Sequence, residues 1–130
     1  MSAADALKNE GNDLLKKNDI VGAVAKYTAA IDIDPKNQVY YSNRSAAYAK
    51  NNQFMNALDD AVKAIELKPT WPKGYSRKGA ALYALNRMEE AKIAYEEAVK
   101  LDPKNPTFIG KVVTLTLTLL IWPLSICRWG

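Results

Sequence analysis

Five side chains that carry hydrogen-bond donors lie at spacings that helices would bring to one surface. Lys8 and Asn12 are four residues apart, as are Lys73 and Arg77, and Asn43 precedes Arg77 by 34 residues. Residues four apart share one face of an α-helix, so the members of each pair are expected to point the same way. Lysine, arginine and the asparagine amide are donors suited to carboxylates, and charge-assisted hydrogen bonds are the stronger kind. The chemistry open to this set is the capture of carboxylates, although solvated surface side chains remain the alternative on these residues alone.

The composition argues against catalysis. The 130-residue chain contains no histidine and one cysteine, Cys127. A disulfide within the chain is therefore impossible, and metal sites built on imidazole or thiolate are nearly excluded. With no nucleophile–base pair and no glycine-rich phosphate loop, we predict a protein that is not an enzyme and uses no cofactor or metal. The charged start of the chain lacks an apolar signal-peptide core, which predicts a reducing, cytoplasmic setting.

The elements that must position the donors form an internal repeat of 34 residues. Proline recurs at the end of each unit and small residues recur within it: Pro35, Pro69, Pro103; Gly11, Ser45, Gly79; Ala23, Ala57, Ala91; and Ala30, Ala64, Ala98. Apolar residues within each unit follow a helical spacing, and each proline stops a helix before it. We predict an all-α fold with first helices near residues 4–17, 38–51 and 72–85, and second helices near 19–33, 53–67 and 87–101.

These features resemble the tetratricopeptide repeat family. Residues 41–48 (YSNRSAAY) and 73–82 (KGYSRKGAAL) are similar to the repeat domains of co-chaperones of the heat-shock organising type. The resemblance extends from about residue 4 to residue 106. It implies a right-handed superhelical stack of three helix-turn-helix repeats (4–37, 38–71 and 72–105) plus a C-terminal capping helix. In the family, first helices line a concave groove and second helices form the convex back.

Positive and negative residues are distributed unequally between the predicted first and second helices. The predicted first helices carry a net positive charge, to which Arg44 and Lys50 contribute, and the second helices a net negative one, to which Asp59 and Asp60 contribute. A basic groove with an acidic back favours a partner of negative charge, although such sorting can also arise by chance on a solvated surface.

By resemblance, the five donors would form a two-carboxylate clamp that holds a partner's C-terminal carboxylate and the side chain of its last aspartate. The clamp residues are then Lys8, Asn12, Asn43, Lys73 and Arg77. The implied partner is the Glu-Glu-Val-Asp tail of heat-shock protein 70 or heat-shock protein 90. Neighbouring groove positions would tune the choice between them: Leu15, Ala46, Ala49, Lys50, Tyr83 and Ala84. The rival hypothesis is a generic scaffold that binds through its convex face or its tail. Nucleic acid is disfavoured because the basic residues of the groove are interleaved with asparagine and alanine, not with stacking aromatics.

The segment 106–130 departs from the family pattern. Asn105-Pro106 is typical of a helix start, but an uncharged run follows from Val112 to Cys127. Three explanations are open. The first is an apolar capping helix whose core-facing residues would be Phe108, Val112, Leu115 and Leu119. The second is a membrane tail anchor, disfavoured because Pro123 interrupts the run and a span needs about 20 residues. The third is a sequence foreign to the domain. Apolar residues and threonines alternate over residues 113–119, which is a pattern typical of a strand.

Overall fold

Seven α-helices make up the computed structural model, which describes residues 1–129 and, for side-chain surroundings, residues 1–121. Their bounds are α1 Ala3–Lys16, α2 Ile20–Ile33, α3 Gln38–Lys50, α4 Phe54–Leu67, α5 Pro72–Ala84, α6 Met88–Leu101 and α7 Pro106–Trp129. The first six helices begin and end within one residue of the spans predicted from the sequence. No strand occurs in the described residues, so the predicted all-α class is confirmed.

Two residues after the end of each first helix, an asparagine adopts the left-handed backbone region. Asn18, Asn52 and Asn86 have φ angles of 63°, 60° and 63°, and they are the described non-glycine residues with positive φ. Asparagine tolerates this region better than most side chains do. Because the next helix begins two residues later, the chain reverses sharply and at the same point in every unit. These turns therefore pair α1 with α2, α3 with α4, and α5 with α6.

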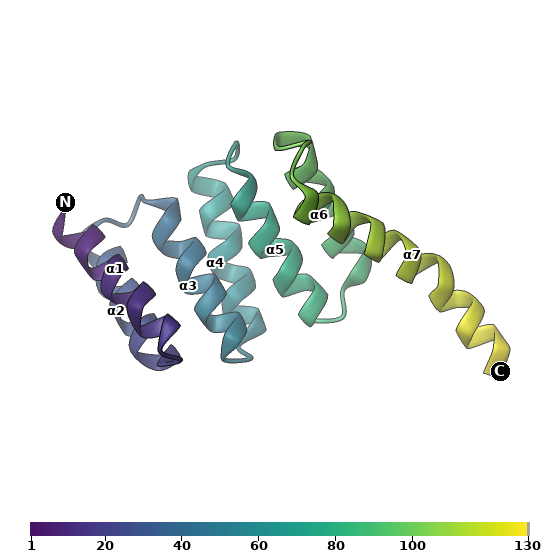
Figure 1. The fold of residues 1–130 in the computed structure, drawn as a ribbon, viewed down its shortest axis with the longest axis horizontal. Coiled ribbons are helices and arrows are strands. Elements are labelled where there is room, and N and C mark those ends of the chain that lie inside the picture. Colours follow the sequence, from purple (N-terminus) through teal and green to yellow (C-terminus); the bar gives the residue numbers. More distant parts are fainter. Residues whose placement is uncertain (130) are drawn as a thin grey trace.

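The helix pairs stack in chain order. Each helix packs on the next one along the chain, and α3 also touches α1 and α5. Figure 1 shows α1, α3 and α5 as a row nearer the viewer, with α2 and α4 behind them, and α7 beyond α5 at the end opposite the N-terminus. Such a stack has one face made of first helices, which is the face that carries the predicted donors.

A small residue on each first helix lets a large ring approach from the second. Gly11 lies against the ring of Tyr27, and a Cβ on Gly11 would stand 2.7 Å from a ring carbon. Gly79 and Tyr95 repeat the arrangement, with 2.6 Å for the same contact. Ser45 holds this position in the second unit and donates its hydroxyl proton to a backbone carbonyl on α4, at 2.7 Å. These close contacts hold each first helix against the second helix of its own unit.

Arg44 and Asp60 form an ion pair inside the second unit, which corrects one prediction. The Nε and Nη2 atoms of Arg44 donate to the two carboxylate oxygens of Asp60 at 2.7 and 2.8 Å. The guanidinium also lies over the rings of Tyr41 and Tyr48. The two charged side chains are only 18% and 7% exposed. The prediction that counted Arg44 as a groove cation and Asp60 as part of an acidic back is therefore wrong, because the pair joins α3 to α4 and neutralises itself.

The predicted helix start at Asn105-Pro106 is confirmed. The Asn105 side-chain oxygen accepts hydrogen bonds from the backbone N–H groups of Thr107, at 3.0 Å, and Phe108, at 3.3 Å. Pro106 is the first residue of α7, where its missing N–H costs nothing. The helix packs on α6, and Leu115, 1% exposed, joins the core cluster that contains Tyr95. A capping helix, rather than a strand, therefore covers the third unit.

Residues 113–119 alternate as a strand would, but they lie within α7. Thr116 and Thr118 each donate a hydroxyl proton to the backbone carbonyl four residues earlier, at 2.8 Å. These bonds satisfy the two hydroxyl groups within the helix itself. Beside Leu115, the expected core residues Phe108, Val112 and Leu119 are half-buried.

The outer face of α7 remains apolar and exposed. Val113, Leu117, Leu120 and Ile121 are each more than half exposed. In the part of the chain that the structure describes, no helix combines the length and apolarity that crossing a membrane requires. Pro123 and Cys127, at the end of the predicted apolar run, lie outside the residues whose side chains are described.

Candidate functional site

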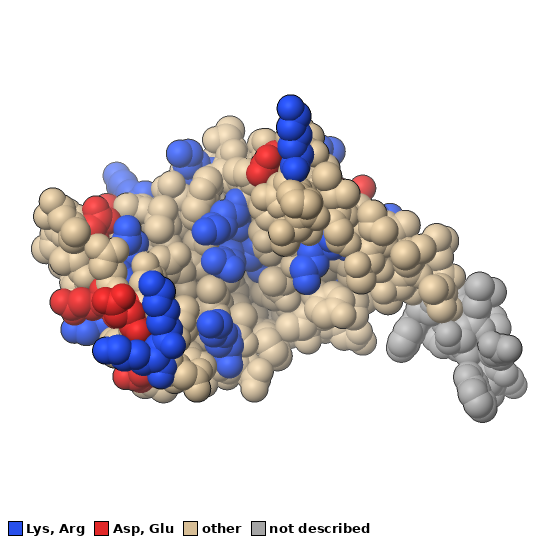
Figure 2. Space-filling model, viewed as in Figure 1, with Lys and Arg blue, Asp and Glu red and all other residues tan. Residues whose placement is uncertain are grey.

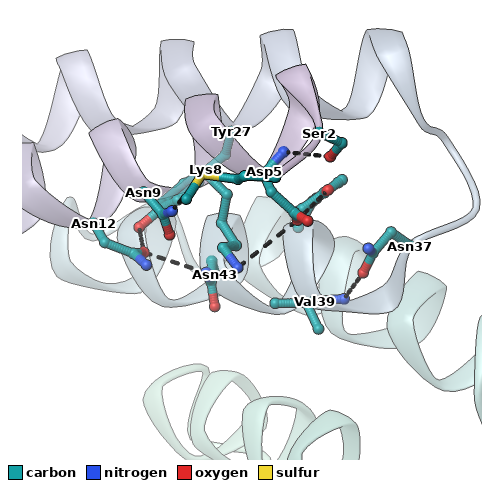
Figure 3. Close-up of polar contacts among 11 residues, drawn as sticks. Ser2, Asp5, Lys8, Asn9, Asn12, Tyr27, Asn37, Val39 and Asn43 are labelled. Atoms are coloured by element: carbon teal, nitrogen blue, oxygen red, sulfur yellow. Dashed lines mark hydrogen bonds and ion pairs between the residues drawn. The ribbon is translucent and has the colours of Figure 1, made fainter.

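Asn12 is the centre of a polar cluster on the first-helix face. Its side-chain oxygen accepts a hydrogen bond from the Tyr27 hydroxyl at 2.6 Å and another from the Asn43 amide nitrogen at 3.2 Å. A carbonyl oxygen has two lone pairs, so both acceptor sites of Asn12 are used. The NH₂ group of Asn12 is consequently held in a fixed direction and can donate to a ligand. Figure 3 shows Asn12 and Asn43 facing each other across α1 and α3.

Lys8 stands one helical turn from Asn12 and is only loosely paired. Its ammonium is 3.8 Å from a carboxylate oxygen of Asp5, which also accepts a 2.6 Å hydrogen bond from the hydroxyl of Tyr40. That hydrogen bond, chiefly, lowers the pKa of Asp5, so the carboxylate stays ionised without Lys8. Figure 3 places the Lys8 ammonium between Asp5 and Asn43. Because a long, partly exposed ion pair contributes little, Lys8 can turn to a ligand carboxylate at small cost.

Arg77 brings a cation from the third unit to the same face. It is half-buried, and its Nε donates to the hydroxyl of Ser42 on α3 at 3.3 Å. Burial lowers the pKa of Arg77, while the nearby Tyr27 and Tyr95 act in the opposite direction. Among the described residues, no carboxylate forms an ion pair with Arg77. A partly desolvated guanidinium without an ion-pair partner is strongly stabilised when the anionic group of a ligand lies beside it.

Lys73 lies one turn before Arg77 on α5 and is exposed. No ion pair to it occurs in the described part of the chain. Figure 2 shows Lys and Arg side chains gathered across the first-helix face, while most Asp and Glu in this view lie toward the N-terminal end. The prediction of a basic first-helix face thus holds without the contribution of Arg44.

The structure brings Lys8, Asn12 and Asn43 together and links Arg77 to α3 beside them. The six predicted specificity positions differ in setting. Ala46 and Ala49 on α3 are half-buried, whereas Lys50, Tyr83 and Ala84, at the ends of α3 and α5, are exposed. Leu15 packs against the core cluster around Tyr27.

Three residues of the cluster were missed by sequence reasoning. Tyr27 orients the predicted donor Asn12, Asp5 forms a loose ion pair with Lys8, and Ser42 accepts a hydrogen bond from Arg77. The repeated glycine opposite a tyrosine could have indicated that the Tyr27 ring runs under α1. Asp5 precedes Lys8 by three residues on α1, a spacing that could have indicated their ion pair. No spacing signal marks Ser42, because its partner Arg77 lies on another helix.

Known proteins share this architecture. The tetratricopeptide repeat profile matches residues 72–105. The first TPR of Spaghetti (RPAP3), solved bound to the HSP90 peptide SRMEEVD, is 36% identical, with a TM-score of 0.87 over 90% of this chain and 93% of that one. This chain belongs to the tetratricopeptide repeat (TPR) family. TPR units are in general interaction modules without catalytic activity.

Two further TPR relatives are similar. The second TPR domain of human RPAP3, solved with the HSP70 peptide SGPTIEEVD, is 29% identical, with a TM-score of 0.82 over 87% of this chain and 94% of that chain. The human small glutamine-rich tetratricopeptide repeat-containing protein beta is 53% identical over 47 residues, which are 36% of this chain and 16% of that protein. The match thus spans a small part of the longer relative.

Proposed function

We propose that this TPR domain binds the acidic C-terminal peptide of heat-shock protein 70 or heat-shock protein 90 through a two-carboxylate clamp, and that it acts as a co-chaperone module rather than an enzyme. The clamp consists of Lys8, Asn12, Asn43, Lys73 and Arg77. Two solved TPR relatives hold peptides that end in Glu-Glu-Val-Asp. A cytoplasmic setting, predicted from the sequence, belongs to the same proposal.

One observation carries the proposal, namely the half-buried guanidinium of Arg77. No carboxylate of the described residues forms an ion pair with Arg77. Its guanidinium donates a hydrogen bond to Ser42 on α3. The oriented amide of Asn12 and the loosely paired Lys8 lie on the same face. Cations and amide donors from three helices can then share one ligand that bears two carboxylates.

The energetics suit a tail that binds reversibly. Hydrogen bonds to charged groups contribute roughly 1.5–3 kcal/mol each. Ordering a flexible peptide offsets much of that gain. We expect a dissociation constant on the order of micromolar, which corresponds to about −8 kcal/mol.

Amidation of the peptide terminus tests the clamp directly. We expect SGPTIEEVD with a free terminal carboxylate to bind about tenfold or more tightly than the same peptide with a terminal amide, because the amide removes one of the two anionic groups. Isothermal titration calorimetry measures both constants. Equal affinities would refute the clamp and favour a scaffold that uses another surface.

Tyr27→Phe tests whether the orientation of Asn12 matters. The ring should still fill the space beside Gly11, but the 2.6 Å hydrogen bond to Asn12 would be lost. One hydrogen bond that positions a donor is worth about 1 kcal/mol, so we expect roughly fivefold weaker binding of SGPTIEEVD. Tyr41→Phe, which loses the 3.0 Å hydrogen bond from a buried tyrosine hydroxyl to the carbonyl of Pro35, is the control. If both variants lost affinity equally, a general packing change would explain the result.

A further inference from the structure

The 34-residue register that relates groove positions of α3 to those of α5 continues into α7, after the third unit. Asn43 and Arg77 are separated by 34 residues, and the same step leads from Arg77 to Lys111. Ala46, a predicted specificity position, is likewise followed by Ala80 and Thr114. The 34-residue register therefore makes α7 a fourth member of the row formed by α1, α3 and α5, as Figure 1 also shows. Lys111 occupies the place on it that a clamp cation holds on α5.

A pocket lies at this continuation of the row. It has a volume of about 190 Å³ and is lined by residues of three helices: Ala80 and Tyr83 of α5, Tyr95 of α6, and Lys111, Thr114 and Leu115 of α7. At roughly 30 Å³ per water molecule, it can hold about six waters, which is room for one side chain of a ligand. Its floor is formed by the ring of Tyr95 and the aliphatic side chain of Leu115, which are 4% and 1% exposed. The cationic group on its wall is Lys111.

Lys111 is available to a ligand. It is exposed, and no ion pair to it occurs within the described residues. The pocket therefore combines an apolar floor with a cation that an acidic side chain can approach. An acidic side chain of a bound peptide would place its methylene groups over Tyr95 and Leu115 and its carboxylate near the lysine.

Geometry selects which peptide residue reaches this pocket. Packed helices lie about 8–10 Å apart, so the pocket stands about one such step beyond Arg77. An extended peptide advances about 3.3 Å per residue, and three residues therefore span that step. When the terminal aspartate is held in the clamp, the residue three positions earlier is the first glutamate of Glu-Glu-Val-Asp.

We infer that Lys111 and the pocket between α5, α6 and α7 form a subsite for an acidic side chain of the clamped peptide, its first glutamate. The inference rests on the proposed function, because the clamp fixes the position of the peptide. It assigns to the atypical α7 a part in recognising the partner, in addition to covering the core.

A set of charge-matched variants tests the subsite by calorimetry. The proteins are the unsubstituted chain, Lys111→Gln and, as control, Lys104→Gln, which removes an exposed charge from the turn before α7. The peptides are SGPTIEEVD and two versions in which either the first or the second glutamate is replaced by glutamine. We expect Lys111→Gln to weaken SGPTIEEVD about two- to fivefold, as befits an exposed ion pair. It should not weaken the peptide that lacks the first glutamate, and Lys104→Gln should change neither constant.

The possible outcomes separate the two proposals. A loss that depends on the first glutamate supports the subsite. An unchanged affinity in Lys111→Gln, or an equal loss for all three peptides, overturns the subsite while leaving the clamp intact. If the unsubstituted chain binds none of the peptides, the proposed function fails and the subsite fails with it. Circular dichroism should give the same helix content for all three proteins.

Discussion

Arg77→Ala is expected to abolish measurable binding of SGPTIEEVD while leaving the fold stable. The guanidinium can supply two charge-assisted hydrogen bonds to a carboxylate, each worth roughly 1.5–3 kcal/mol. Their loss would weaken a micromolar complex by about 100-fold or more. Lys73→Ala, one turn earlier on α5, should have the same direction of effect but a smaller size, because its side chain is exposed. Calorimetry at fixed salt measures both.

Stability provides the second half of this test. Burial lowers the pKa of Arg77, which means that the folded environment disfavours its charge. Removing this partly desolvated cation offsets the loss of its hydrogen bond to Ser42, so the free energy of unfolding should change by less than about 1 kcal/mol. Lys78→Ala is the matched control, since Lys78 holds the repeat position of Arg44, which turns toward the second helix of its unit. Unchanged affinity in Arg77→Ala, or equal loss in Lys78→Ala, would contradict the clamp.

The 34-residue register explains why the helices could be predicted within one residue. Proline after each second helix and asparagine in each first turn fix both ends of a hairpin by local backbone preference. Asn18, Asn52 and Asn86 do so by adopting positive φ, which few side chains tolerate. Three copies of the same local signals leave little freedom for the bounds to shift.

The direction in which an individual charged side chain points could not be predicted in the same way. Asn43 and Arg44 are adjacent, so they point about 100° apart on a helix of 3.6 residues per turn, and a charge count treats them alike. The contact of Arg44 with Asp60 joins two helices and depends on their approach. Likewise, the bond from Tyr27 to Asn12 depends on how closely α2 lies against α1. Spacing within one helix gives the face of a residue, whereas partners across helices follow from packing.

Asp60→Ala is expected to lower the free energy of unfolding by about 3 kcal/mol without touching the clamp. Breaking a buried ion pair costs about 3–5 kcal/mol because the remaining charge is left without a partner. The lower end applies here, since Arg44 is 18% exposed and can regain some water. A loss of this size is a large share of the 5–15 kcal/mol typical of a domain. Urea unfolding followed by circular dichroism measures it, with the exposed neighbour Asp59→Ala as control.

The double variant Arg44→Met with Asp60→Leu shows whether the pair itself or the orphaned charge is responsible. Burial raises the pKa of the Asp60 carboxyl in spite of Arg44, which indicates that desolvation opposes the pair. Replacing both charges by apolar side chains removes that cost, so the double variant should recover most of the stability lost in Asp60→Ala. At temperatures where each variant is folded, all should bind SGPTIEEVD as the unsubstituted chain does. If Asp60→Ala lowered the free energy of unfolding no more than Asp59→Ala does, the ion pair would not hold α3 and α4 together.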